Sequence, residues 1–256
     1  MKRNFLSENR KILVIVVVVI LCVLGISFVA GYATRDNNSL NGEKQTEKNE
    51  SLDLESISGY ASEQISGIQL PDSLEETGLC IQSIGRYTGP FVEDGSDDPS
   101  VNLLSLIITN ESDQMIEYAE LVFKVNEDDD AVFKITSLPA GSSVLVQESN
   151  KKTFEDISCF ALEQKMIAVN KDASLKNEIL SISADQNTLH LKNRTKDSLG
   201  TVYVRYKNML QDNLYMGGIT YSCRFDDVGG NADVTQQTGH FIENYSVILD
   251  IVTESN

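Results

Sequence analysis

The stretch LIITNESDQMIEYAELVFK, residues 106–124, decides the expected fold. In its second half, apolar residues occupy every second position, at Ala119, Leu121 and Phe123, and the pattern continues to Val125. Successive side chains of a β-strand point to opposite faces of the sheet. This period of two therefore predicts a half-buried strand over residues 116–125.

The same pattern recurs 83 residues further on, from position 106 to position 189, as LHLKNRTKDSLGTVYVRYK. The two stretches align without a gap, with Asn110 opposite Asn193 and Lys124 opposite Lys207. Each copy predicts a strand, an Asn-x-Ser/Thr turn and a second strand. A period of this length suits a small β-sandwich, because immunoglobulin-like units run to about 100 residues. We therefore expect two tandem immunoglobulin-like antiparallel β-sandwiches, over residues 78–170 and 177–254.

Further strand patterns support an all-β ectodomain. They cover residues 131–136, 144–147, 165–169, 179–183, 188–192, 201–206, 219–225 and 245–252. Turn formers separate them, as in Leu138-Pro139-Ala140-Gly141. The sequence between them shows no amphipathic helix pattern, which argues against a parallel βαβ architecture.

An apolar run, ILVIVVVVILCVLGISFVA, covers residues 12–30. A helix needs about 20 such residues to cross the hydrocarbon core of a membrane. Lys2, Arg3, Arg10 and Lys11 precede it. The positive-inside rule then predicts a cytosolic N-terminus, residues 1–11, and an extracellular remainder. We expect an uncleaved signal anchor in the cell membrane. A cleaved signal peptide is the alternative, because Gly31-Tyr32-Ala33 offers a small-x-small site.

Residues 31–77 are rich in Asn, Ser, Glu and Lys. Their apolar residues are too sparse to form a core, so the composition predicts a disordered polar linker.

The charge of the chain excludes one class of partner. The first 35 residues contain five basic residues and one acidic residue, and the chain contains 21 and 38. Residues 36–256 therefore hold 16 basic and 37 acidic residues, a net charge of −21. Such a surface repels phosphate backbones and anionic lipid headgroups, so no nucleic acid partner is expected.

An anchor, a polar linker and paired sandwiches with an Asn-x-Ser/Thr bend resemble uncharacterised extracytoplasmic proteins of Gram-positive bacteria. YVRYKN at 203–208, followed by LYMGGITYSC at 214–223, is distantly similar to FxLYD-type immunoglobulin-like domains. Phe-x-Leu-Tyr-Asp itself does not occur, and the nearest match is Asn213-Leu214-Tyr215-Met216. The resemblance implies an architecture and a location, and it supplies no catalytic residues.

Chemistry-bearing residues are few. Outside the apolar run lie Cys80, Cys159 and Cys223. Cys80 and Cys159 fall near the edges of the first predicted sandwich, where they could form a disulfide. Three free thiols acting as small hydrophobes are the alternative. Neither His190 nor His240 lies in a catalytic or zinc-binding motif, so no enzyme activity, metal or cofactor is expected.

The stretch SIGRYTGPFVEDGSDDPS, residues 83–100, predicts a loop between two strands. The candidate binding residues in it are Arg86, Tyr87, Phe91, Glu93, Asp94, Asp97 and Asp98. The carboxylates do not follow the D-x-[DN]-x-[DN]-G calcium pattern, which leaves calcium as the weakest interpretation. The two aromatic side chains either pack back over the sandwich or await a partner, and we expect packing.

The sequence as a whole predicts a non-catalytic, membrane-anchored surface protein that binds a protein or an envelope component. The membrane is contacted through the one N-terminal helix. An accessory or regulatory subunit of an envelope enzyme, with any chemistry at Cys223 or His240, is one alternative, and a structural spacer is the other.

Overall fold

The computed structural model describes residues 54–254. The predicted cytosolic N-terminus, the predicted anchor at 12–30 and the first part of the linker lie outside the described residues. Within residues 54–254, no helix has the length and apolarity that a membrane span requires.

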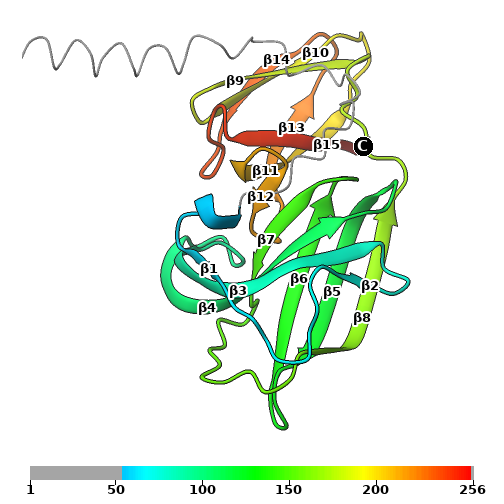
Figure 1. Cartoon of the computed structure of the whole chain (residues 1–256). Helices are drawn as coiled ribbons and strands as arrows, with labels where there is room; N and C mark the ends of the chain where they lie inside the picture. Colours follow the sequence, from blue (N-terminus) through cyan, green and yellow to red (C-terminus); the bar gives the residue numbers. More distant parts are fainter. Residues whose placement is uncertain (1–53, 255–256) are drawn as a thin grey trace, which may run out of the picture. The chain divides into compact units, whose positions relative to one another are not determined.

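The described chain consists of β-strands and one 3-10 helix, η1 (Leu54–Ser56), which confirms the all-β prediction (Figure 1). The strands are β1 (Tyr60–Ser62), β2 (Asp72–Leu74), β3 (Leu79–Phe91), β4 (Asp98–Asn110), β5 (Met115–Lys124), β6 (Asp130–Leu138), β7 (Ser143–Gln147), β8 (Ala161–Asn170), β9 (Leu180–Asp185), β10 (Thr188–Asn193), β11 (Gly200–Gln211), β12 (Leu214–Met216), β13 (Tyr221–Val228), β14 (Asp233–Gln237) and β15 (Ser246–Glu254).

The internal repeat predicted from the sequence is present as a repeat of strand order. In the first repeat, β3 to β8, one sheet has the order β3-β4-β7 and the other β6-β5-β8. In the second repeat, β9 to β15 without β12, the orders are β9-β10-β14 and β13-β11-β15. The first, second and fifth strands of each repeat thus form one sheet, and the fourth, third and sixth form the other.

The Asn-x-Ser/Thr bends are built identically in the two repeats. Asn110 and Asn193 are fully buried. The amide nitrogen of Asn110 donates to the carbonyl oxygens of Gln114 and Leu138, and its oxygen accepts from the backbone and hydroxyl of Ser112. Asn193 makes the corresponding four bonds to Asp197, Gly229 and Thr195. A buried amide whose donors and acceptor are all satisfied fixes the bend between the two sheets.

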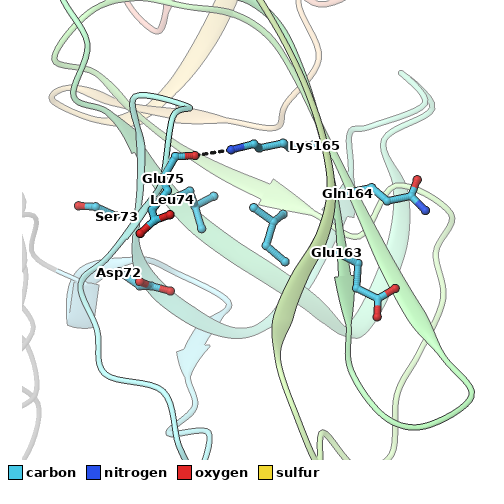
Figure 2. A pocket seen from close by; sticks show the side chains of 8 residues that line it. Asp72, Ser73, Leu74, Glu75, Glu163, Gln164 and Lys165 are labelled. Carbon is cyan, nitrogen blue, oxygen red and sulfur yellow. Dashed lines mark hydrogen bonds between the residues drawn. The ribbon is translucent and has the colours of Figure 1, made fainter.

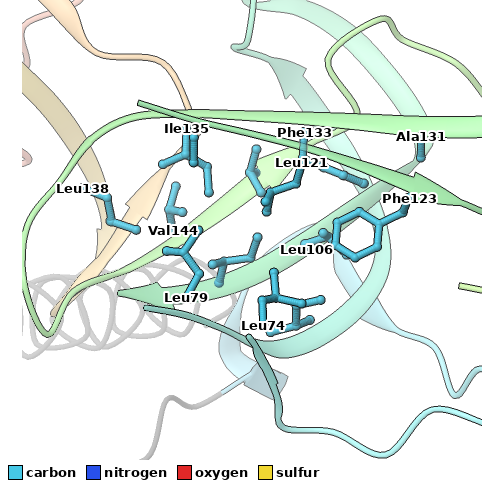
Figure 3. Packing of buried hydrophobic residues seen from close by; sticks show 14 of the residues in the cluster. Leu74, Leu79, Leu106, Leu121, Phe123, Ala131, Phe133, Ile135, Leu138 and Val144 are labelled. Atoms are coloured by element: carbon cyan, nitrogen blue, oxygen red, sulfur yellow. The ribbon is translucent and has the colours of Figure 1, made fainter. Parts of the chain in front are cut away.

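Each repeat has an apolar core, and the core of the first also includes Tyr215 on β12 and Leu249 on β15. In the first repeat, Leu121 and Phe133 on one sheet point toward Leu106 and Val144 on the other (Figure 3). In the second, residues such as Leu191, Val204 and Phe225 form a separate cluster. The alternation seen in the sequence places these side chains, because every second residue faces inward.

Strand β12 breaks the repeat. It lies in a segment between β11 and β13 that has no counterpart between β5 and β6. It pairs antiparallel with β11 and parallel with β7, with Leu214 opposite Ser143. One nine-stranded sheet therefore contains strands from both predicted domains.

The linker prediction is wrong for residues 54–77, which are ordered. Strand β1 pairs with β3, and Ile57 packs against Tyr87, Ile107 and Leu145 on the outer face of the sheet. Gly85 permits the approach, since a Cβ there would overlap the carbonyl oxygen of Ala61. Sparse apolar residues cannot form a core alone, but they can bury themselves on an existing sheet.

Candidate functional site

The expected loop at residues 83–100 is a long hairpin instead. Strands β3 and β4 pair as far as Phe91 and Asp98, so only residues 92–97 form the connection. The loop prediction is thus wrong for most of the stretch. Pro90 and Pro99, which suggested a break, lie opposite each other near the hairpin end. Prolines are tolerated at such irregular positions of a ladder.

Three of the candidate binding residues are buried. Phe91 is 1% exposed, Tyr87 5% and Arg86 8%. The Arg86 side chain donates to the Phe154 carbonyl oxygen and pairs with Glu63. The packed interpretation is therefore confirmed for the two aromatic side chains, and these three residues offer a partner almost no surface.

Glu93, at the hairpin tip, holds the two repeats together. Its carboxylate accepts hydrogen bonds from the backbone nitrogen of Gly218, at 3.0 and 2.9 Å, and from that of Gln147, at 2.9 Å. Gly218 lies in the turn between β12 and β13, and its carbonyl oxygen accepts from the backbone nitrogen of Thr136 on β6. Three segments far apart in the sequence meet at this carboxylate.

The second member of this junction is Lys207, which is fully buried. Its ammonium group donates to the carbonyl oxygens of Gly217, Gly218 and Ile219, at 3.1, 2.8 and 2.6 Å. Burial raises the pKa of Glu93 to about 7, and burial lowers the pKa of Lys207 to about 7, with the opposite charge of each partner resisting the shift. All three donors of the amine are used by the backbone, so its role is to fix the turn.

Sequence reasoning missed Lys207 because strict alternation points it outward. Alternation holds along β11, with Val204 and Tyr206 in the core of the second repeat and Lys207 on the opposite face, where the turn after β12 covers its side chain. Its counterpart Lys124 forms an ion pair with Asp130 and is 31% exposed. The sequence feature that could have indicated the burial of Lys207 is the connection after it, which is longer than the connection after Lys124.

The remaining acidic candidates lie at the surface of the tip. Asp94 and Asp98 both face Lys151, at 3.4 and 4.0 Å, and Asp97 lies 3.3 Å from His240. Within residues 54–254, no group of three potential metal ligands occurs. The carboxylates of the tip are thus directed at basic side chains of the same chain.

The described cysteines are free thiols, which agrees with the free-thiol alternative, and the possible bridge between Cys80 and Cys159 is not formed in this structure. The Cys159 thiol instead donates to the Lys124 carbonyl oxygen at 3.7 Å. Burial raises the pKa of Cys223 to about 11. A protonated, buried thiol is a poor nucleophile, which weighs against an enzyme built on Cys223.

A groove that the sequence did not suggest lies between β2 and β8 (Figure 2). Its volume is about 360 Å³, and it is lined by Asp72, Ser73, Leu74, Glu75, Leu162, Glu163, Gln164 and Lys165. Leu74 and Leu162 form its apolar part, and the ammonium of Lys165 closes one end by donating to the Glu75 carbonyl oxygen. Its two walls are about ninety positions apart in the chain, so no local spacing reveals it.

The chain matches no family model, and a search of curated proteins gives no match either.

Proposed function

We propose that the chain is a non-catalytic, membrane-anchored cell-surface protein whose two immunoglobulin-like sandwiches bind a protein or envelope component as one rigid body. The anchor and the outward orientation come from the apolar run at residues 12–30 and the basic residues before it. The resemblance to extracytoplasmic FxLYD-type domains supports the same location.

The observation that carries the proposal is the junction of the two repeats. Glu93 and the β7–β12 pairing join them through buried hydrogen bonds and a shared sheet, and Lys207 fixes the turn that Glu93 contacts. Buried charges cost free energy unless they are satisfied, and here backbone groups satisfy both. A junction of this kind holds two sandwiches at a fixed separation, which suits presentation of a surface away from the membrane.

Photo-crosslinking on intact Gram-positive cells that produce the full chain tests this function. The probe replaces, one at a time, four exposed apolar residues: Val101, Met166, Ile242 and Tyr245. A control probe replaces Asp128 in the exposed β5–β6 turn. A discrete adduct at one or more apolar positions and none at the control is the expected result. Absence of adducts at all four positions would favour the spacer.

Location is tested separately. A tag placed after Asn256 should bind an antibody added to intact cells, because the C-terminal side is expected outside. A tag that becomes accessible only after the membrane is permeabilised would contradict the proposed orientation.

A further inference from the structure

The groove between β2 and β8 lies at an open edge of the first repeat. Strand β8 pairs with β5 on one side, and within residues 54–254 no strand pairs with its other side. An open edge presents a row of backbone donors and acceptors that another extended segment can use. The same strand carries exposed apolar side chains, with Met166 61% and Val169 40% exposed.

The groove is acidic and has an apolar floor. Asp72 on β2 and Glu163 on β8 are part of its lining, with Leu74 and Leu162 as the apolar residues, and the Glu163 side chain leaves β8 on the side away from β2 (Figure 2). Within the described residues no basic side chain forms an ion pair with Asp72 or Glu163. Lys165, the basic residue of the lining, is directed instead at the Glu75 carbonyl oxygen and the Glu76 carboxylate. A lysine or arginine side chain fits this arrangement, since its aliphatic stem can pack on the leucines while its charged end reaches the Asp72 carboxylate.

We propose that this edge binds an extended basic segment of a partner protein, which adds to β8 as a strand and places a Lys or Arg side chain in the groove. This inference deepens the proposed function by giving the partner's chemistry, and it rests on that function. The favoured occupant is a basic partner rather than a second copy, because residues 36–256 carry a net charge of −21 and a second copy would bring the same acidic edge.

Features of β8 limit pairing with a second copy. Its pairing with β5 contains two bulges, one between Val122 and Phe123 and one between Ile116 and Tyr118, which leave residues 164–168 as the regular part. Lys165 lies opposite Leu121, whose side chain faces the core, so it is an inward-directed charge on an edge strand. Bulges and inward charges are known devices against edge-to-edge aggregation. A short segment that pairs only with the regular part of β8 is compatible with the bulges and with the inward-directed Lys165.

Binding of a defined peptide to the purified full chain, in detergent micelles, tests the inference. The probe is a fluorescent ten-residue peptide that alternates Lys and Val, and the matched peptide alternates Glu and Val. A third peptide repeats the Lys/Val sequence with alternate backbone nitrogens methylated, which removes strand donors and keeps the charge. We expect binding of the first alone.

Two matched variants locate the site. Asp72→Asn/Glu163→Gln removes two of the three carboxylates of the groove lining, and Glu127→Gln/Asp128→Asn removes two exposed carboxylates of the β5–β6 turn. We expect the groove variant to weaken binding about tenfold at low salt and the turn variant to change it less than about twofold. Melting temperatures equal to that of the wild type show that both variants fold.

Several outcomes overturn the inference. Equal weakening by both variants would show general charge attraction, and retained binding of the methylated peptide would exclude strand addition. Self-association of the wild type in light scattering, abolished in the groove variant, would assign the edge to a second copy. Absence of peptide binding together with a crosslinked partner on cells would end this inference and leave the proposed function standing.

Discussion

Asn110 and Asn193 occupy equivalent positions in the repeat and make equivalent bonds. Each is fully buried and links a bend to a segment far along the chain. If either amide is removed, two carbonyl oxygens lose their donor in the interior. A buried polar group without a partner costs more than the bond itself contributed.

We predict that Asn110→Ala and Asn193→Ala each lower the free energy of unfolding by about 2–4 kcal/mol. Urea unfolding followed by circular dichroism measures this. The control is Asn177→Ala, at an exposed position, which should change stability by less than about 0.5 kcal/mol. The two bends would not be equivalent if only one of the two variants lost stability while the other behaved like the control.

The Glu93 and Lys207 pair predicts a characteristic dependence of stability on pH. The pKa of Glu93 rises from 4.5 to about 7, so between these values the folded chain binds more protons and stability falls with rising pH. The pKa of Lys207 falls from 10.5 to about 7, so above pH 7 the unfolded chain binds more protons and stability rises with pH. The contribution of the pair to stability is therefore lowest near pH 7.

Comparison of the wild type with Glu93→Gln/Lys207→Met isolates this contribution, because the other titrating groups are common to both. The double variant loses the donor to three carbonyl oxygens, which lowers its stability by an amount independent of pH. The stability advantage of the wild type should grow on either side of pH 7, by up to about 1.4 kcal/mol per pH unit. Unfolding in urea at about pH 5.5, 7 and 8.5 measures it. An advantage that stays constant across these values would refute the shifted pKa values.

Strand alternation predicted the elements that have enough residues to show a period. Strands such as β5 and β11 were found from the sequence because their inward faces are apolar at every second position. Three elements it missed, β1, β2 and β12, have three residues each, too few for a period. Strand β14 was missed because it is mostly exposed and polar on both faces.

The candidate sites were harder to predict than the strands. Arg86, Tyr87 and Phe91 were assigned to a loop because the sequence around them has the composition of a loop. The hairpin buries them, and this depends on residues 54–62 and 147–154 packing against it. The junction and the groove each combine groups from distant segments, which only the tertiary fold brings together.

The turn between β12 and β13 requires glycine at position 218 for a steric reason. A Cβ there would overlap the backbone carbonyl oxygen of Lys134 on β6. We predict that Gly218→Ala lowers the free energy of unfolding by about 2–3 kcal/mol, since the Gly218 backbone cannot move away from Lys134 without losing the Glu93 contacts. The matched control is Gly229→Ala, where a Cβ meets no atom within 4 Å. Thermal unfolding of both variants measures the difference, and equal melting temperatures would show that the turn is free to shift.

Shared elements make the two repeats interdependent across the described chain. Unfolding of the second repeat would separate β12 from β7. It would also remove the Gly218 backbone nitrogen from the Glu93 carboxylate. Unfolding of the first would leave Lys207 and its turn without the hairpin tip. The apolar clusters support the same conclusion, because Tyr215 on β12 and Leu249 on β15 belong to the cluster of the first repeat, while the other core residues of the second repeat form their own cluster.

We therefore predict that the full chain shows a single cooperative unfolding transition for its β-structure in calorimetry, with equal calorimetric and van't Hoff enthalpies. Glu93→Ala removes the bonds to Gly218 and Gln147 but keeps the β7–β12 pairing, so it should weaken the coupling and lower the van't Hoff enthalpy below the calorimetric one. The control variant Asp94→Ala alters the adjacent exposed tip residue and should keep one transition. Two transitions in the wild type would mean that the sandwiches are only tethered. The shared sheet would then not hold the two sandwiches rigidly, and the proposal that they bind a partner as one rigid body would be contradicted.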